Sequence, residues 1–184
     1  MDATTETGET RTFAPFLAGL QGGMVGVLWM LAWLGVSASW QRRSFWTSEN
    51  LLASAFYGDA AIRSDFAFST LSGLALYLLL YSLLGAAFAA AVRERPSQLR
   101  TLLLGIAFSL GWYYLSFHWI WRTVSPLVTL LHAERPTVIG HLVYGTFLGR
   151  YPRYLARTPQ PAPVPETPPE TQTSPETPVE TNPE

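Results

Sequence analysis

The sequence predicts an all-α integral membrane protein with about four transmembrane helices in an antiparallel bundle. Charged residues make up only 14% of the chain and hydrophobic residues 48%, a balance typical of membrane proteins. Residues 13–40 and 66–92 contain no charged side chain, and each is longer than the about 20 residues that a helix needs to cross a bilayer. Two further apolar stretches follow them. We therefore expect one transmembrane domain at 13–157 between polar ends.

Composition and motifs exclude several classes of function. The net charge is -1, which offers no attraction for nucleic acid. No cysteine is present, so disulfides, thiolate metal sites and cysteine nucleophiles are excluded. The sequence also lacks the P-loop, GxGxxG and GxSxG patterns of nucleotide-binding proteins and serine hydrolases. The uncharged stretches contain no carboxylate, whereas a proton-coupled transporter is expected to carry one within a span.

The first span is expected at residues 14–40, behind a solvated, disordered tail at 1–12. Pro15 is tolerated in a first helical turn, which places the start of the helix near Ala14. The uncharged stretch is too long for the core of a signal peptide, so we expect a retained span. Small residues at four-residue spacing form one face of this helix, and helices in lipid pack through such faces. This glycine face consists of Gly19, Gly22, Gly23 and Gly26.

Residues 41–65 form the longest loop, and the middle of this loop predicts a short amphipathic interfacial helix. The helix is expected to begin near Thr47 or Ser48, either of which could cap it, and to end at Gly58. Its apolar positions are Leu51, Leu52, Ala55 and Phe56. The aromatic residues beside it, Trp40, Phe45 and Trp46, are of the kind that collect at the headgroup layer. We expect the helix to lie flat on the bilayer, and the alternative is a lid over a site.

The second span is expected at residues 66–92. Its later half presents small residues at helical spacing, and this small-residue face is the natural mate of the glycine face. Its members are Ser82, Gly85, Ala86 and Ala89. The sequence RERPSQLR follows at 93–100 and predicts a tight turn between antiparallel helices, because Pro96 ends the helix.

The third span is expected at residues 99–121, and aromatic side chains crowd its second half. They are Trp112, Tyr113, Tyr114, Phe117, Trp119 and Trp121. An aromatic belt at the membrane surface is the ordinary interpretation of such a cluster, and a pigment or quinone site is the alternative. Residues 124–136 predict an interfacial turn or a shallow re-entry.

The fourth span, at residues 137–155, has the shortest uncharged core of the four. Only residues 137–149 carry no charge, so the helix reaches bilayer thickness only when it includes the Arg and Tyr side chains that follow, which can snorkel to the headgroups. Gly145 and Gly149 give this helix a small-residue face. Residues 158–184 repeat Pro-Glu-Thr and predict an acidic, disordered tether.

The three histidines are the one constellation in the sequence that predicts a site. Antiparallel threading brings His118, His132 and His141 to the same boundary of the membrane. Three imidazoles at one depth could bind zinc or copper, and His118 or His141 could hold a haem or another pigment. The alternative is that each histidine makes a structural hydrogen bond, because no HExxH motif is present.

The distribution of arginine predicts the orientation of the chain. All twelve basic residues are arginine, and four spans would place seven of them on the side of both termini and five on the other. Basic residues accumulate in cytoplasmic loops. Both termini are therefore expected in the cytoplasm, with the protein in the inner (plasma) membrane of a bacterial type of cell.

The sequence leaves two functions open. The first is a non-enzymatic accessory or scaffolding subunit that packs against other membrane protein subunits, since the chain has more small-residue faces than one bundle needs and ends in a tether. The second is a membrane-embedded enzyme or carrier for a lipid or another small hydrophobic molecule. The polar side chains available to such a protein would be the histidines together with Glu49, Asp59 and Asp65 of the first loop. In either case we expect the protein to contact the lipid bilayer and not to bind nucleic acid.

Overall fold

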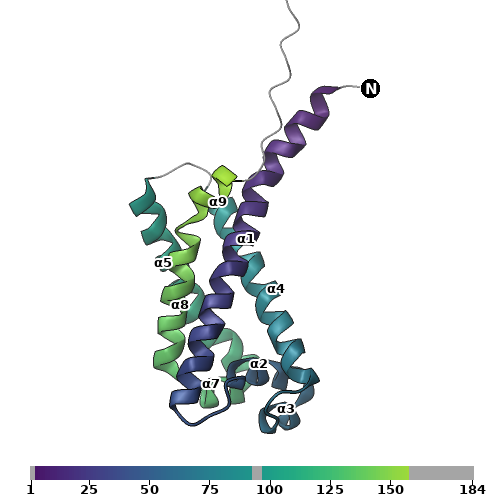
Figure 1. Cartoon of the computed structure of the whole chain (residues 1–184), viewed down its shortest axis with the longest axis vertical. Coiled ribbons are helices and arrows are strands. Elements are labelled where there is room, and N and C mark those ends of the chain that lie inside the picture. The colour runs from purple at the N-terminus through teal and green to yellow at the C-terminus, as the bar shows by residue number, and fades with distance from the viewer. Residues whose placement is uncertain (1–2, 93–96, 158–184) are drawn as a thin grey trace, which may run out of the picture.

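The computed structural model describes residues 3–92 and 97–157, and the secondary structure of this part of the chain is entirely helical (Figure 1). Three stretches are long and apolar enough to cross a membrane, namely Phe13–Trp40, Phe68–Ala91 and Gln98–Val124. The predicted class, an all-α protein with membrane-type helices, is therefore confirmed. The expected disordered tail at 158–184 and residues 93–96 of the predicted turn lie outside the described residues.

The helices differ widely in length. The long ones are α1 (Ala3–Trp40), α4 (Phe68–Ala91) and α5 (Gln98–Leu115). The last of these continues through a π-helical turn, η1 (Ser116–Ile120), into α6 (Trp121–Val124). The shorter helices are α2 (Thr47–Tyr57), α3 (Asp59–Arg63), α7 (Pro126–Leu131), α8 (Glu134–Leu148) and α9 (Tyr151–Arg157).

Helix α1 begins earlier than the sequence predicts. Its backbone is helical from Ala3, where a disordered tail was expected at 1–12 and a helix start near Ala14. Extending an existing helix adds one hydrogen bond per residue without the cost of a new nucleus. The long apolar helix therefore continues outward into the polar segment, and Pro15 lies inside it rather than in its first turn.

The fourth apolar segment is shorter than the span predicted at 137–155. Helix α8 has 15 residues, which corresponds to about 22 Å of helix against a hydrocarbon core of about 30 Å. It ends at Leu148, and α9 begins at Tyr151. Pro152 explains the break, because it has no N–H to donate to the carbonyl of Leu148 and its ring crowds that carbonyl.

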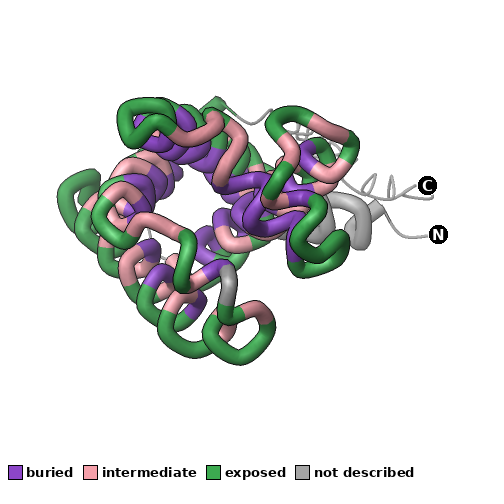
Figure 2. The backbone as a smooth tube through the Cα atoms, turned by 90° about the horizontal axis from the view of Figure 1, so that it is seen from below, coloured by how far each residue is buried: buried purple, intermediate pink, exposed green. Residues whose placement is uncertain are grey.

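Helix α1 lies at the centre of the packing. It contacts α4 on one side and α8 on the other, and α8 contacts α5 in turn (Figure 1). Figure 2 looks along the helices and shows their buried residues turned toward the inside of the bundle. The chain returns at α9 to the early part of α1, where the ring of Tyr154 faces Gly22.

Close backbone approach joins α1 to α4. A Cβ atom built on Gly19 would lie 2.6 Å from the Cβ of Ala89, and one built on Gly23 would lie 2.5 Å from the carbonyl oxygen of Tyr81. Gly85 of α4 faces both of these glycines. Such contact through small residues takes the place of hydrophobic attraction, which is missing between helices in lipid.

The predicted glycine face serves two neighbours rather than one. Gly22 and Gly26 point away from α4, toward α9 and α8. A Cβ atom on Gly26 would lie 2.9 Å from the ring of Tyr144, whereas one on Gly22 would make ordinary contact with Tyr154 at 3.4 Å. The small-residue face of α4 lies against Gly19 and Gly23 only, and its members there are Ser82, Gly85, Ala86 and Ala89.

Helices α5 and α8 approach through a second group of glycines. A Cβ atom on Gly105 would lie 2.6 Å from the carbonyl oxygen of Gly145, and one on Gly149 would lie 2.7 Å from the Cα of Leu102. Gly105 is absent from the packing residues that the sequence predicts. Its partners Gly145 and Gly149 thus face α5 of the same chain.

Helix α2 packs against the end of the helical bundle. Leu51 and Leu52 are buried, but Phe56 is 73% exposed. The helix lies across one end of the bundle against α4 and α7 (Figure 1), and Gly73 of α4 leaves room there for the backbone carbonyl of Glu49. Contact with α4 therefore decides which side of α2 is buried.

Helix α2 begins at Thr47 and ends at Gly58, as predicted, but its N-cap differs from the prediction. Trp46 occupies the N-cap position and offers no side-chain hydrogen bond, although Thr47 or Ser48 was expected to cap the helix. The hydroxyl of Thr47 donates instead to the carbonyl of Ser44 at 2.6 Å. The helix ends at Gly58, whose φ of 63° suits glycine.

We predict that Gly23→Ala destabilises the protein by about 1–3 kcal/mol, because the added methyl group meets the carbonyl oxygen of Tyr81 across the α1–α4 contact. Gly22→Ala is the matched control, since its methyl group makes only an ordinary contact with Tyr154. Thermal unfolding of both variants in detergent checks this. Equal melting temperatures would show that the α1–α4 contact does not depend on Gly23.

Candidate functional site

Three hollows lie in series at the end of the bundle that α2 covers. The inner cavity, of about 30 Å³, lies between α1, α4, α5, η1 and α8, with single residues from α2, α6 and α7 and His132 completing its wall. The middle pocket, of about 20 Å³, shares His132 and Thr137 with the inner cavity. The outer pocket, of about 230 Å³, shares Arg43 and Thr47 with the middle pocket. Polar residues thus form part of the wall from the α1–α2 loop to the interior of the bundle.

A tyrosine and a histidine form the polar centre of the inner cavity. The hydroxyl of Tyr81 lies 2.9 Å from Nε2 of His141, and Nδ1 of His141 lies 2.8 Å from the carbonyl oxygen of Thr137. A carbonyl oxygen can only accept a hydrogen bond, so Nδ1 carries a proton and Nε2 is free to accept from the Tyr81 hydroxyl. A neutral imidazole satisfies both hydrogen bonds, and no ring nitrogen is left over.

Hydrogen bonds to the backbone hold this pair in place. Ser109 of α5 donates to the carbonyl oxygen of His141 at 2.6 Å. The hydroxyl of Tyr144 donates to the carbonyl oxygen of Tyr81, also at 2.6 Å. These bonds connect α5 to α8 and α8 to α4, so the pair is oriented by three helices. Such support from surrounding groups is what a binding or catalytic site requires.

Two buried donors in the wall of the inner cavity make no close hydrogen bond among the described residues, namely the indole N–H of Trp112 and the hydroxyl of Tyr113. The hydroxyl of Tyr81 lies near the first, and the carboxylate of Glu134 lies near the second. A buried polar group without a partner costs about 1–3 kcal/mol, and native proteins usually satisfy such groups with water or a ligand. The inner cavity has room for one or two water molecules at about 10–15 Å³ each, but it cannot take an acyl chain.

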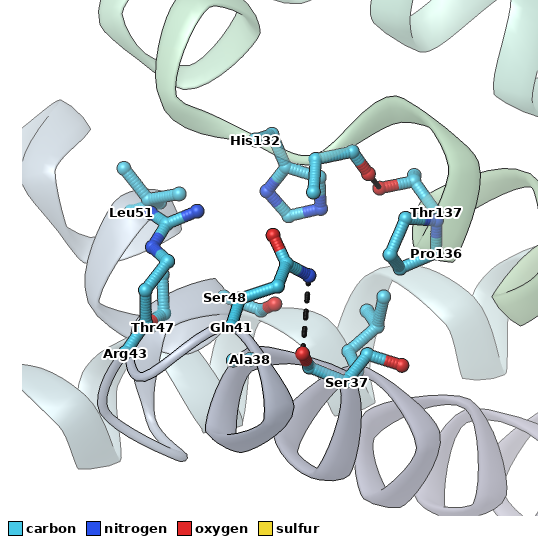
Figure 3. Close-up of a pocket in the computed structure, with 12 residues that line it drawn as sticks. Ser37, Ala38, Gln41, Arg43, Thr47, Ser48, Leu51, His132, Pro136 and Thr137 are labelled. Atoms are coloured by element: carbon cyan, nitrogen blue, oxygen red, sulfur yellow. Dashed lines mark hydrogen bonds between the residues drawn. The ribbon is translucent and has the colours of Figure 1, made fainter.

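The middle pocket brings polar side chains from both sides into one hollow. Figure 3 shows the carboxamide of Gln41 and the ring of His132 facing each other across it. The Nε2 atom of Gln41 donates to the carbonyl of Ser37 at 3.0 Å, which leaves the carboxamide oxygen on the side of the ring. Within the described residues the buried hydroxyl of Ser37 has no partner. Arg43 donates from Nη1 to the carbonyl of Leu131 at 2.8 Å.

Glu49 is a buried carboxyl group at the same end of the bundle. Its side chain is 2% exposed, and Oε2 has no hydrogen-bond partner in the described part of the chain. Burial raises the pKa of Glu49 from 4.5 to about 7. The neighbouring Asn50 fixes α2, because it donates to the carbonyls of Ser64 and Asp65 and accepts from Thr70. The sequence places no carboxylate within a span, yet the fold buries this one beside α4.

The other two carboxylates named from the sequence stay at the surface. Asp59 and Asp65 are exposed. Asp65 accepts a hydrogen bond from the hydroxyl of Ser44, which joins the α1–α2 loop to the segment before α4. Neither residue lines the three hollows.

The structure brings two of the three histidines to one cavity and leaves the third outside. His132 and His141 both line the inner cavity. His118 lies on η1, is exposed, and stacks on Tyr114 with a centroid distance of 4.4 Å. The ring of Tyr113 contacts the rings of both His118 and His141. Among the described residues, no three His, Asp or Glu side chains are grouped as metal ligands, so the histidine trio is not assembled.

The aromatic residues of the third span divide between two environments. Tyr114 and Trp119 are 66% and 77% exposed, as side chains of a membrane-surface belt are expected to be. The others line the inner cavity, namely Trp112, Tyr113, Phe117 and Trp121. The cluster is therefore split between the surface and the interior of the bundle, and the π-helical turn at Ser116–Ile120 changes which side chains point inward. The inner cavity, at about 30 Å³, is too small for a pigment or a quinone.

Sequence reasoning missed the tyrosines that carry most of the site. Tyr77 and Tyr81 are four residues apart on α4, and their rings stack with centroids 5.8 Å apart. Tyr144 is fully buried between them and α1. A signal was present, because tyrosine hydroxyls in an otherwise leucine-rich span need a polar partner inside the protein.

Comparison with known proteins places the chain in a family. A family of unknown function, DUF6789, matches residues 13–162. This match spans all the helices described above apart from the first part of α1. No curated protein and no solved structure matches the chain.

We predict that Glu49→Gln stabilises the protein above pH 7 and has little effect below about pH 4.5. The raised pKa means that the folded protein keeps a proton that the unfolded chain releases, so stability is lost as pH rises from 4.5 to about 7. Removing the ionisable group should recover about 1–3 kcal/mol at pH 8.

Unfolding of parent and variant between pH 4 and pH 8 measures this difference. The pKa of His132 is lowered from 6.5 to about 4, mainly by burial and then by the nearby His141 and Arg43. The stability that the neutral His132 contributes is therefore lost as pH falls from 6.5 to about 4. That loss occurs in both proteins and cancels in the difference. A difference that does not change with pH would contradict the assignment to Glu49.

Proposed function

This chain belongs to the family of unknown function DUF6789, and we propose that it is a membrane protein that binds a small polar solute inside its helical bundle. The Tyr81–His141 pair at the inner cavity carries the proposal. Polar groups inside a membrane protein are costly, and they generally mark a pathway or a binding site. A protein that served only as a scaffold would gain stability from apolar residues at these positions.

The size and chemistry of the hollows select the kind of solute. The inner cavity and the middle pocket hold about 30 Å³ and 20 Å³, which suits a solute of a few atoms rather than a lipid. The hydroxyl of Tyr113 and the N–H of Trp112, which make no close hydrogen bond within the described part of the chain, line the inner cavity and can donate to such a solute. This differs from the lipid or hydrophobic molecule that the sequence favours for a carrier or enzyme. A role in moving or converting the solute would use the same hydrogen-bonding groups.

We predict that at least one class of small solute raises the melting temperature of the purified protein and that Tyr81→Phe reduces this rise. A ligand that binds only the folded state stabilises it by about 2.7 kcal/mol at one hundred times its Kd. The measurement is thermal unfolding in detergent against a panel of halides, short carboxylates, alkylamines and neutral amides, each at equal ionic strength.

Tyr57→Phe is the matched control for this experiment. It also removes a tyrosine hydroxyl, but Tyr57 lies on the outer side of α2, where it pairs with Ser72. Equal ligand effects in both variants, or no effect of any solute on the parent, would contradict binding at the inner cavity.

A second candidate is the accessory subunit, and one glycine favours it. Gly111 of α5 is exposed, and no heavy atom lies within 4 Å of a Cβ atom built on it. A small residue on the outer face of a membrane helix gives a transmembrane helix of another protein room to approach. The other small-residue faces pack against one another within the chain. They therefore give less support to an accessory subunit than the sequence suggested. A partner protein that stays bound in mild detergent, in the absence of any solute effect, would favour this candidate.

For the orientation we predict that a cysteine at Ala60 reacts with an impermeant thiol reagent on intact cells, while cysteines at Thr5 and Thr173 do not. The reason is the excess of arginine on the side of both termini. The chain has no native cysteine, so each label reports one position. Labelling at Thr173 would place the C-terminus outside and leave three crossings.

A further inference from the structure

Three arginines share one face of α9 and of the turn before it. Arg150, Arg153 and Arg157 follow one another at intervals of three and four residues, which places them within an arc of about 60° on a helix. All three are exposed, and no hydrogen bond or ion pair joins their side chains to another described residue. We call this group the α9 arginine face.

The other side of α9 is anchored in the bundle. Tyr151 is 7% exposed, and its ring contacts that of Phe88 on α4 with centroids 6.5 Å apart. The ring of Tyr154 lies against Gly22 of α1, and Leu155 packs against the hydrophobic core. These contacts fix the rotation of the helix, so the α9 arginine face is held outward.

Helix α9 lies where neighbouring membrane-type helices begin or end. Phe88, which contacts Tyr151, is within about one turn of the end of α4. Leu102, which faces Gly149, is about one turn after the start of α5. Figure 1 shows α9 at the same end of the bundle as the start of α5. The α9 arginine face therefore lies at the level where phospholipid headgroups surround such a protein.

The described surroundings of α9 carry positive charge without a balancing negative charge. Residues 13–27, 82–92, 97–110 and 142–157 contain no Asp or Glu, and Arg100 is a further cation among them. Glu6 and Glu9 belong to the first turns of α1, which project beyond the bundle (Figure 1). This end of the bundle thus attracts anions.

An aromatic platform adjoins the α9 arginine face. The guanidinium carbon of Arg150 lies 5.0 Å from the centroid of the Phe147 ring. That ring stacks on Trp29 of α1, with centroids 6.2 Å apart and planes 12° apart. Trp29 is 59% exposed on the side of a membrane-type helix. Arginine in contact with a ring keeps N–H groups for hydrogen bonds, and arginine binds phosphate through two of them at once.

We propose that the α9 arginine face binds the phosphate group of an anionic phospholipid, whose acyl chain lies along the Trp29–Phe147 platform. Three cations on one helix face select a lipid with net negative charge over one whose phosphate is balanced by choline. The apolar platform beside them selects a lipid over a free phosphate ion. This site is at the other end of the bundle from the three hollows, and it does not depend on the proposed function.

Phosphatidylglycerol against phosphatidylcholine tests the proposal in the full-length protein. Native mass spectrometry counts the lipid molecules that the purified protein retains, and thermal unfolding in detergent measures their effect. A third arm contains inorganic phosphate at equal ionic strength. We expect phosphatidylglycerol to bind at least tenfold more tightly than phosphatidylcholine and, alone of the three, to raise the melting temperature.

A triple variant with glutamine at the three positions of the α9 arginine face should weaken phosphatidylglycerol binding at least tenfold. The matched control removes three exposed arginines at the other end of the bundle by Arg63→Gln, Arg122→Gln and Arg135→Gln. It makes the same change of net charge and should alter the affinity less than twofold.

Trp29→Ala tests the platform without changing any charge, and it should weaken phosphatidylglycerol binding severalfold. Trp119→Ala is its control, because Trp119 is also exposed but lies on η1 at the other end of the bundle. Equal losses in the two tryptophan variants would contradict a chain bound along Trp29 and Phe147.

Four further outcomes would overturn the inference. Equal binding of both lipids would show a contact without headgroup selection, and an equal effect of inorganic phosphate would show a site for the free ion. Equal losses in the two triple variants would assign the effect to overall charge. If the α9 variant is destabilised without lipid and deletion of residues 158–184 does the same, the acidic end of the chain is the occupant. Solute binding at the inner cavity is measured separately, so each proposal can fail alone.

Discussion

Close contact between backbones is the constraint on which the rest of the structure depends. Lipid gives helices no hydrophobic reason to associate, so α1 approaches α4 through Gly19 and Gly23, and α5 approaches α8 through Gly105 and Gly145. Each approach is too close for a side chain at the contact. The aromatic residues between these two contacts share one interior.

The polar interior follows from this approach. The position of Gly23 against the carbonyl of Tyr81 brings α4 next to α1, and Tyr144 of α8 then reaches the same carbonyl with its hydroxyl. Tyr81 is thereby held where its own hydroxyl meets His141. The packing of small residues and the placement of the hydrogen-bonding groups are therefore one arrangement, and a shift of α1 would disturb both.

Helix α2 completes the site from a position outside the long helices. It rests on α4 where Gly73 admits its backbone, and this contact buries Glu49 and places Thr47 and Ser48 at the middle pocket. The end of the bundle is thus covered by protein and remains lined with polar groups. This combination supports the proposed binding of a small solute.

The sequence by itself determined the helical class, the three long apolar helices, the end of α2 at Gly58 and the small residues available for packing, because these depend on local composition and spacing. Tertiary structure alone decided that the glycines of α1 serve two neighbours, that His118 stays apart from His132 and His141, and that Glu49 is buried. It also brought Tyr81 to His141, which are separated by 60 residues. Helical periodicity shows which side chains share a face of one helix, but which faces meet depends on how closely the backbones can approach, and that distance is set by pairs of residues far apart in the chain.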